Sequence, residues 1–427
     1  MSVRPNGWGF HGHARTFAFR EGTRNVNCRF CHSPVSLQFI NLVNAPPSNS
    51  FLTRAQLGEP EMYFPLTVFV CEACWLVQID EYKRHDEIFD RNYAYFSSFS
   101  TSWLNHCRSY VQDMIARLGL GADSLAVEVA SNDGYLLQYF KERSIRCLGI
   151  EPTASTAAAA KARGIDTIEE FFGAEFAERL VTGRGQADLM LGNNVLAHVP
   201  NINDFVEGFR IALKPTGTVT FEFPHLLNLI RLNQFDTIYH EHFSYLSLLA
   251  VRAILAAHGL TVYDVEELPT HGGSLRVFAR HDANNALPIQ PAVEDLIRRE
   301  RSARLDCPVG YRGLQVAADR IRNEFLSFLL KEAQQGHKVA AYGAAAKGNT
   351  FLNYCGIKGN QLIAFVVDRS PHKQGLFLPG SHIPVVDESH LRDARPDFIV
   401  ILPWNLRQEI STQLAYVREW GGRASRK

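Results

Sequence analysis

The sequence predicts an α/β protein in which two doubly wound, Rossmann-like units follow a small cysteine-rich domain. Two apolar segments, 125–129 and 339–342, each lead into a glycine-containing turn and then a helix start. That order is typical of the first strand and helix of a doubly wound sheet. Two Cys-x-x-Cys pairs precede both segments. We therefore expect four regions: an N-terminal extension (1–25), a zinc-binding domain (26–90), a central core (91–285) and a C-terminal Rossmann-like domain (286–427).

The composition agrees with this organisation and excludes some partners. The chain has 427 residues, enough for about three domains of ~150 residues each. Hydrophobic residues make up 46% and charged residues 21%, which allows large buried cores. The formal net charge is zero, so a nucleic-acid partner is not expected. Without an apolar run near 18 residues or a signal peptide, we expect a cytoplasmic protein with no membrane partner, and a monomer.

The two cysteine pairs, Cys28 with Cys31 and Cys71 with Cys74, predict a zinc site. Four thiolates can surround zinc tetrahedrally at about 2.3 Å and leave no open coordination position, so the site should be structural. Cysteines without an export signal also fit a reducing compartment. The alternative is a redox dithiol, but such motifs come singly and inside a βαβ unit.

The central core contains an ordered set of polar residues at the ends of its expected strands. The turn Ser131-Asn132-Asp133-Gly134 lacks the G-x-G-x-x-G spacing of dinucleotide sites. Glu151, at the end of the second strand, suits both hydroxyls of a ribose. The set resembles the S-adenosylmethionine site of class I methyltransferases. The predicted cofactor-binding residues are Glu128, Ala130, Asn132, Asp133, Gly134, Glu151, Asn193 and Asn194. Glu151 as a helix N-terminal acid, and the asparagines as plain turn formers, are the alternatives.

A third feature is the run Tyr239-His240-Glu241-His242-Phe243-Ser244-Tyr245, which follows an apolar strand. If it is extended, Glu241 and Tyr245 share a side; if it is helical, Tyr239 and His242 share a face. A histidine beside a carboxylate can be fixed in one tautomer and act as a general base. The alternative is a polar segment at a domain boundary.

Taken in order, the cysteine pairs, Ser131–Gly134 and the run Tyr239–His242 resemble the zinc-containing sugar C-methyltransferases, from about Cys28 onward. These enzymes act on nucleotide-linked 4-keto-deoxysugars. The resemblance implies a class I methyltransferase core and methylation at carbon 3 of a sugar carried by thymidine diphosphate, with guanosine or cytidine diphosphate possible. It implies zinc ligands at the four cysteines and a base at His242, oriented or polarised by Glu241. The further catalytic residues implied are Tyr239, Tyr93 and His198, with Tyr95 and His240 at the substrate.

The C-terminal unit repeats the strand, glycine turn and helix start. Exposed amides and Lys347 at that helix start suit a pyrophosphate, and the resemblance favours the nucleotide sugar over a second cofactor. Lys347, Asn349 and Asp368 are therefore predicted to bind substrate. The segment His271-Gly272-Gly273-Ser274 could touch the sugar, or be an ordinary turn. Two rival functions are an NAD-dependent sugar dehydrogenase, which the first turn fits poorly, and a non-catalytic nucleotide-sugar-binding protein, which leaves the run at 239–242 unexplained.

Overall fold

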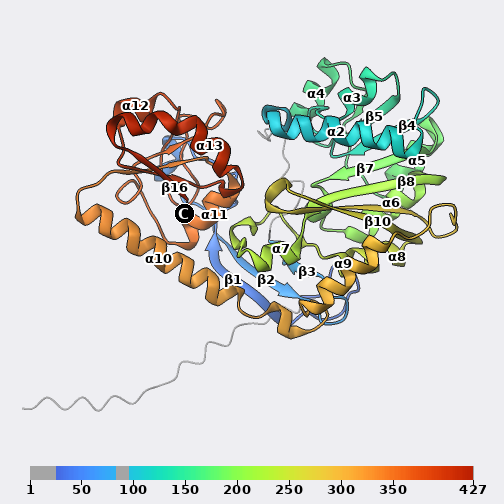
Figure 1. Cartoon of the computed structure of the whole chain (residues 1–427), viewed down its shortest axis with the longest axis horizontal. Helices are drawn as coiled ribbons and strands as arrows, with labels where there is room; N and C mark the ends of the chain where they lie inside the picture. Colours follow the sequence, from blue (N-terminus) through green and yellow to red (C-terminus); the bar gives the residue numbers. More distant parts are fainter. Residues whose placement is uncertain (1–25, 83–95, 427) are drawn as a thin grey trace, which may run out of the picture.

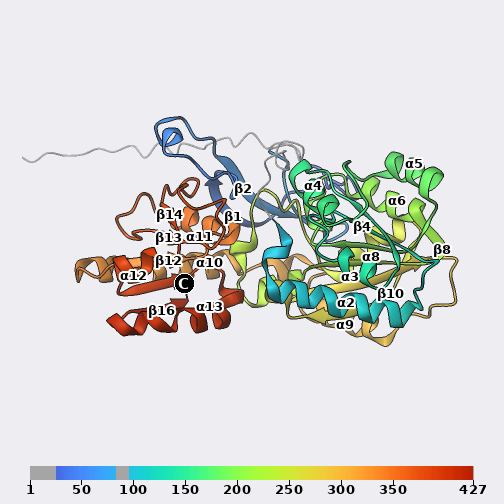
Figure 2. The same cartoon turned by 90° about the horizontal axis from the view of Figure 1, so that it is seen from above.

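The structure is a computed structural model that describes residues 26–82 and 96–426. Two α/β lobes are joined along one side by a small sheet and by helix α10 (Figure 1). Seen from above, strands β1 and β2 of that sheet lie at the junction of the lobes (Figure 2). Of the described helices, none is long and apolar enough to cross a bilayer.

The central lobe is built on a seven-stranded sheet in the order β10-β11-β8-β7-β4-β5-β6. Strands β4 to β8 are parallel, and β11 is antiparallel to both of its neighbours. The strands are β4 Leu125–Val129, β5 Arg146–Ile150, β6 Thr167–Ile168, β7 Ala187–Asn193, β8 Leu213–Pro224, β10 Leu260–Leu268 and β11 Ser274–His281. The helices are α2 Thr101–Leu118, α3 Leu137–Glu142, α4 Ala154–Ala162, α5 Ala174–Arg184, α6 Ile202–Ala212, α7 Leu226–Arg231, α8 Leu248–Ala257 and α9 Pro291–Ser302.

Helices cover both faces of this sheet, which explains why its central strands are buried along most of their length. Along β4, Val127 and Val129 belong to the core formed with α5, α6 and α8, whereas Ala126 belongs to the core formed with α2 and α3. Every residue of β4 is buried. A parallel strand covered on both faces is expected to be continuously hydrophobic. This confirms the class I methyltransferase fold predicted for the core.

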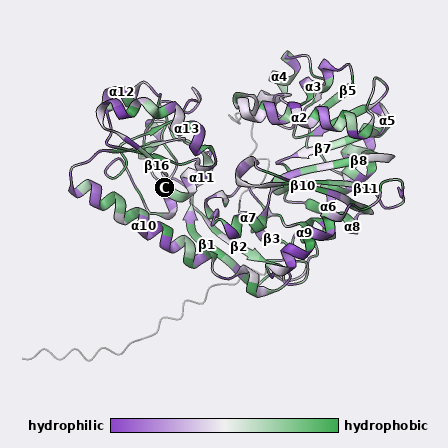
Figure 3. Cartoon of the chain, in the orientation of Figure 1, coloured by the Kyte–Doolittle hydropathy of each residue, from purple (hydrophilic) through white to green (hydrophobic). Residues whose placement is uncertain are grey.

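The C-terminal lobe contains a second, five-stranded sheet in the order β14-β13-β12-β15-β16, and all of its pairings are parallel. Its strands are β12 Val339–Tyr342, β13 Val366–Val367, β14 Val385–Val386, β15 Phe398–Ile401 and β16 Arg423–Arg426. Its helices are α10 Leu314–Gln334, α11 Ala346–Tyr354, α12 His390–Ala394 and α13 Arg407–Gln413. Helix α10 is amphipathic along its length (Figure 3). Its residues Leu314, Ala318, Phe325 and Leu329 are buried.

The small sheet that joins the lobes has the order β1-β2-β3-β9 and is antiparallel. Strands β1 Leu37–Ala45, β2 Phe64–Val70 and β3 Val77–Ile79 come from the cysteine-rich region. Strand β9, Ser244–Tyr245, comes from the third feature of the sequence, although the expected boundaries place it in the central core. Tyr245 pairs with Val77. The titratable run is thereby attached to the zinc-binding region.

Candidate active site and metal centre

The four paired cysteines converge on one point. Their Sγ atoms all lie within 4.8 Å of one another, with Cys28 to Cys74 and Cys31 to Cys71 each at 3.5 Å. Zinc–sulfur bonds of about 2.3 Å require tetrahedral edges of about 3.8 Å, so the donor set fits zinc. It is the one such cluster among the residues that the structure describes.

The backbone of the two pairs is folded alike. The N–H of His32 donates to the Cys28 carbonyl at 2.9 Å, and the N–H of Trp75 donates to the Cys71 carbonyl at 2.8 Å. His32 and Trp75 both have φ of +61°. Two matching turns therefore present the four thiol groups, as expected for a tetrathiolate site.

The predicted cofactor residues gather at the carboxyl ends of β4, β5 and β7. In the turn after β4, Ala130, Asn132 and Gly134 have φ of 57°, 49° and 73°. A Cβ atom at Gly134 would lie 2.9 Å from Ile165, so glycine is required there. The buried carboxylate of Glu151 accepts the N–H of Asn132 at 2.9 Å. Glu151 thus holds the turn against β5, and its contact with a ribose stays a prediction.

Several buried oxygens at this edge lack a hydrogen-bond partner among the described residues. They are Ser131 Oγ, Asp133 Oδ1, Asn193 Oδ1 and Asn194 Oδ1. Buried polar atoms are nearly always paired, so a group of unpaired acceptors at one sheet edge indicates a polar ligand. Burial raises the pKa of Glu128 well above its usual range, with the nearby carboxylates of Asp133 and Glu151 adding to the effect. These residues fit the hydroxyl and ammonium groups of S-adenosylmethionine.

His242 is oriented by a backbone carbonyl. Its Nδ1 lies 2.8 Å from the carbonyl oxygen of Thr237. Because a carbonyl only accepts, Nδ1 carries the hydrogen and Nε2 keeps its lone pair. The His242 N–H donates to the Tyr239 carbonyl at 2.9 Å, and the two rings lie 4.0 Å apart. The segment is therefore a turn that leads into β9, and neither the extended nor the helical alternative describes it.

His198 stands beside His242 in the same protonation state. Its Nδ1 lies 2.8 Å from the carbonyl oxygen of Glu241, and its ring lies 4.6 Å from that of His242. The carboxylate of Glu241 accepts two hydrogen bonds, 2.8 and 2.9 Å long, from Nδ2 of Asn49. Asn49 lies between β1 and β2, and this contact could not be predicted from the sequence. Thr237 makes the orienting bond to His242 that the sequence suggested for Glu241.

The remaining residues of the predicted catalytic set are placed less centrally. The Nε2 atom of His240 lies 3.2 Å from the carbonyl oxygen of Pro65 on β2, so this ring is held by the joining sheet. Tyr93 and Tyr95 fall outside the described residues. Soon after them, the N–H of Ser97 donates to Asn132 in the cofactor turn at 2.9 Å. A substrate role for His240 and the tyrosines stays a prediction.

The segment His271-Gly272-Gly273 also reaches the cofactor edge. His271 has φ of 54°, and its Nε2 lies 3.1 Å from Nδ2 of Asn194. Its ring lies 5.2 Å from that of Trp103 on α2. The segment therefore contacts the cofactor loop through Asn194, and its contact with the sugar stays a prediction.

The C-terminal lobe contributes one cation, the ammonium group of Lys347, to the predicted substrate site. Lys347, in the first turn of α11, donates to Oδ1 of Asn405 at 2.8 Å, and its Nζ lies 5.0 Å from the ring centre of Trp404. No side chain caps the start of α11, which suits an anion. Asp368 accepts the N–H of Ala344 at 2.8 Å and so holds the preceding turn.

Asn349 is buried, and its Nδ2 lies 3.4 Å from the carbonyl oxygen of Ser48 in the zinc-binding region. The hydrogen bond from Asn349 to Ser48, like that from the Ala344 N–H to Asp368, joins two parts of the chain. Substrate contacts for Lys347, Asn349 and Asp368 remain predictions.

Burial keeps the site's histidines neutral. It lowers the pKa of His198 to about 4 and that of His271 to about 4. Burial also lowers the pKa of His242 well below its usual range, and the neighbouring His198, Lys347 and His271 act in the same direction. All three imidazoles therefore hold an unprotonated nitrogen at neutral pH.

This arrangement predicts that the fold is sensitive to acid. The unfolded chain binds protons on His198 and His271 below about pH 6.5, whereas the folded chain does so only near pH 4, because burial lowers the pKa of both groups. The stabilisation is thus fully present above pH 6.5 and is lost as pH falls toward 4. The melting temperature of the His198→Gln variant should fall less between pH 7 and pH 5 than that of the wild type. Equal falls in the two proteins would contradict the assignment.

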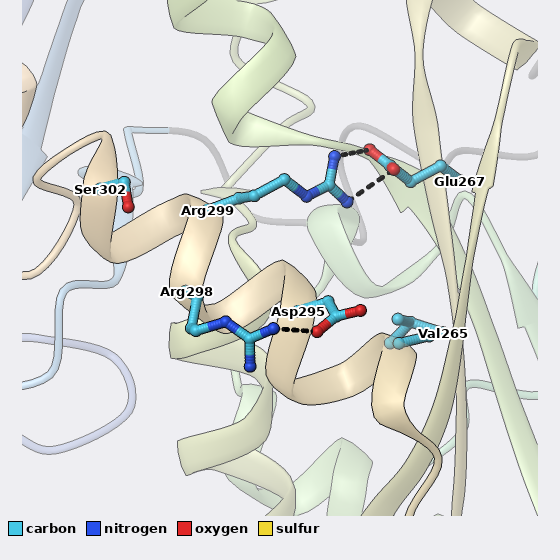
Figure 4. A pocket seen from close by; sticks show the side chains of 7 residues that line it. Val265, Glu267, Asp295, Arg298, Arg299 and Ser302 are labelled. Carbon is cyan, nitrogen blue, oxygen red and sulfur yellow. Dashed lines mark hydrogen bonds and ion pairs between the residues drawn. The ribbon is translucent and has the colours of Figure 1, made fainter.

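A separate surface cavity of about 590 Å³ lies between β10 and α9 (Figure 4). Arg299 pairs with Glu267 at 2.6 Å, and Arg298 pairs with Asp295. The charged groups that line it are therefore already paired. Of the predicted site residues that the structure describes, none lines this cavity.

The fold and the site define a methyltransferase that carries a zinc-binding domain. Three family models match the chain in succession: a zinc-binding domain at residues 28–89, a methyltransferase domain at 103–265 and the C-methyltransferase C-terminal domain at 269–425. The chain is 35% identical over 396 residues to the C-methyltransferase NovU of Streptomyces niveus, covering 93% of this chain and 94% of that one. The chain belongs to this C-methyltransferase family.

Solved structures show only a distant likeness. Magnesium protoporphyrin IX methyltransferase from Synechocystis PCC 6803, with bound SAH, is 14% identical over 41% of this chain and 82% of its own, with a TM-score of 0.34. An S-adenosylmethionine-dependent methyltransferase from Clostridium acetobutylicum is 9% identical over 42% of this chain and 92% of its own, with a TM-score of 0.35.

Proposed function

We propose that the protein methylates carbon 3 of a nucleotide diphosphate-linked 4-keto-deoxysugar, with S-adenosylmethionine as the methyl donor. One observation carries the proposal: the neutral imidazole of His242 is oriented by the Thr237 carbonyl and lies 4.6 Å from the ring of His198. His198 follows β7, the strand that ends at the predicted cofactor residue Asn193. Methylation of carbon requires removal of a hydrogen that is acidic only because a ketone is adjacent. A positioned general base is therefore needed, and it must be unprotonated at neutral pH.

In the proposed reaction, Nε2 of His242 takes the proton next to the ketone. The electrons of that C–H bond form an enolate, and the hydrogen bond from Nδ1 to Thr237 keeps the imidazolium ring in place. Tyr239, whose ring lies 4.0 Å from that of His242, is proposed to donate to the enolate oxygen. One such donor contributes roughly 2.7–4 kcal/mol to the transition state. The enolate carbon would form its new bond to the electrophilic methyl group that S-adenosylmethionine supplies, while the bond from that methyl group to sulfur breaks and S-adenosylhomocysteine leaves with the electron pair.

The C-terminal lobe is proposed to bind the nucleotide diphosphate. Lys347 and the uncapped start of α11 together offer a cation and backbone N–H groups, the combination that binds phosphates. We propose thymidine diphosphate as the carrier. The four cysteines are proposed to hold a structural zinc ion, since four sulfur ligands leave no position for substrate.

The test is to incubate the protein with isotope-labelled S-adenosylmethionine and a thymidine diphosphate 4-keto-6-deoxysugar. We expect the label on carbon 3, measured by NMR of the product. A label on oxygen or nitrogen would reject the proposal. Calorimetry with S-adenosylmethionine and with NAD distinguishes it from the dehydrogenase alternative, because only the first should bind.

A further inference from the structure

We propose that Trp404 is a positioning residue: through it, the C-terminal lobe fixes the position of the general base, His242. Its indole holds Asp236, and the next residue, Thr237, provides the carbonyl that orients His242. The inference rests on the proposed function, because it assigns a partner to the base of that reaction.

The first contact is a hydrogen bond from Trp404 to the segment that precedes the general base. Trp404 begins a short helical turn, η7 (Trp404–Leu406), directly after β15. Its Nε1 donates to Oδ2 of the buried Asp236 at 2.9 Å. A hydrogen bond to a charged acceptor is stronger and shorter than a neutral one. The C-terminal lobe therefore holds residue 236, in a segment that also packs on α11 through the rings of Phe235 and Phe351.

The second step leads from Asp236 to the base. Asp236 and Thr237 belong to the short turn η4 (Phe235–Thr237). Thr237 is itself fixed, because its N–H and its Oγ1 both donate to the carbonyl of Gln234, at 3.0 and 2.7 Å. Its carbonyl accepts Nδ1 of His242 at 2.8 Å. One peptide unit thus separates the residue held by Trp404 from the atom that orients His242.

The indole also touches the loop that reaches the cofactor edge. A Cβ atom at Gly272 would lie 2.3 Å from Trp404, so the ring packs directly on this glycine. The adjacent His271 contacts Asn194. On the C-terminal side, the Nζ of Lys347 lies 5.0 Å from the ring centre, a cation–π contact. The side chain of Trp404 therefore contacts three segments: Lys347, which is proposed to bind phosphate, Asp236 in the turn before the base, and Gly272 in the loop that reaches the cofactor edge.

Both features of the indole are used, its flat face and its N–H. Phenylalanine would keep a ring beside Lys347, but it would lose the bond to Asp236 and the outer indole atoms, Cη2 and Cζ3, that face Gly272. Small displacements of a base are costly: a misplacement of about 1 Å can cost on the order of 100-fold in rate. Trp404→Phe therefore removes the hydrogen bond together with part of the packing, whereas Asp236→Ala removes the bond and leaves the indole in place.

The experiment measures the base directly. The 4-keto sugar is incubated with enzyme and S-adenosylhomocysteine in D2O, and exchange of the hydrogen on carbon 3 is followed by NMR. We expect Trp404→Phe to slow exchange at least 10-fold with unchanged affinity for S-adenosylhomocysteine. Trp420→Phe is the matched control, because it loses a bond of the same indole N–H to the Pro396 carbonyl, 3.1 Å long, in the same lobe.

A second variant protects the test against misfolding. Asp236→Ala should slow exchange at least 10-fold as well, and the double variant should be no slower than the slower single one, because both single variants remove the same bond between Trp404 and Asp236. Exchange at the wild-type rate in either single variant, or additive losses, would overturn the inference. The inference would also be overturned if the exchange rate fell only in proportion to a lower melting temperature or a weaker affinity for S-adenosylhomocysteine. Absence of exchange and of methylation in the wild type would instead reject the proposed function.

Discussion

Replacing His242 with glutamine is expected to lower the rate of methyl transfer at least 100-fold while S-adenosylhomocysteine still binds. A general base contributes about 10²- to 10⁴-fold. The amide of glutamine can still donate to the Thr237 carbonyl, which the imidazole now contacts at 2.8 Å, but it has no basic nitrogen. Initial rates of labelled methyl transfer and calorimetric binding of S-adenosylhomocysteine are the two measurements.

His258→Gln is the matched control for this variant. The ring of His258, at the end of α8, contacts Glu207 at 3.2 Å and Asn203 at 3.1 Å and none of the site residues. It should transfer methyl groups at the wild-type rate. If His242→Gln also did so, the base would lie elsewhere. His198 would then be the next candidate, because its Nδ1 is likewise bound to a carbonyl.

Much of the fold could be predicted because its signals are local. Segments 125–129 and 339–342 became β4 and β12, since buried parallel strands are apolar along their whole length. The cysteine pairs are close in sequence, and each forms its own turn. The pairing of β9 with β3 is different. A strand of two residues has no hydrophobic period, and its partner lies more than 160 positions earlier in the chain.

The candidate site follows the same division. His242 and His198 could be found because the resemblance carries them as side chains in fixed motifs. Asn49, the Thr237 carbonyl and Trp404 could not, because their importance comes from the meeting of three distant parts of the chain. A backbone carbonyl in particular leaves no trace in residue type. The turn at 239–242 brings Tyr239 and His242 together as a helix would, without being one.

The second large effect is expected from the zinc centre, although none of its ligands belongs to the proposed catalytic set. Cys71→Ser should release zinc, lower the melting temperature and reduce methyl transfer at least 10-fold. The reason is connectivity. The N–H of Cys71 donates to the carbonyl of Leu76 at 2.9 Å, and β3 begins at the next residue and pairs with β9. Strand β9 begins two residues after His242.

Zinc binds to small zinc-finger peptides with a free energy of roughly 10–16 kcal/mol. Loss of the zinc ion is therefore a large change compared with the free energy of unfolding of a domain. A disordered joining sheet would also free Asn49 from the carboxylate of Glu241. Metal content, thermal unfolding and methyl transfer are measured on one preparation. Cys307→Ser, outside the metal cluster, is the control and should keep all three. A zinc-free variant with wild-type turnover would show that β9 holds the base without the metal centre.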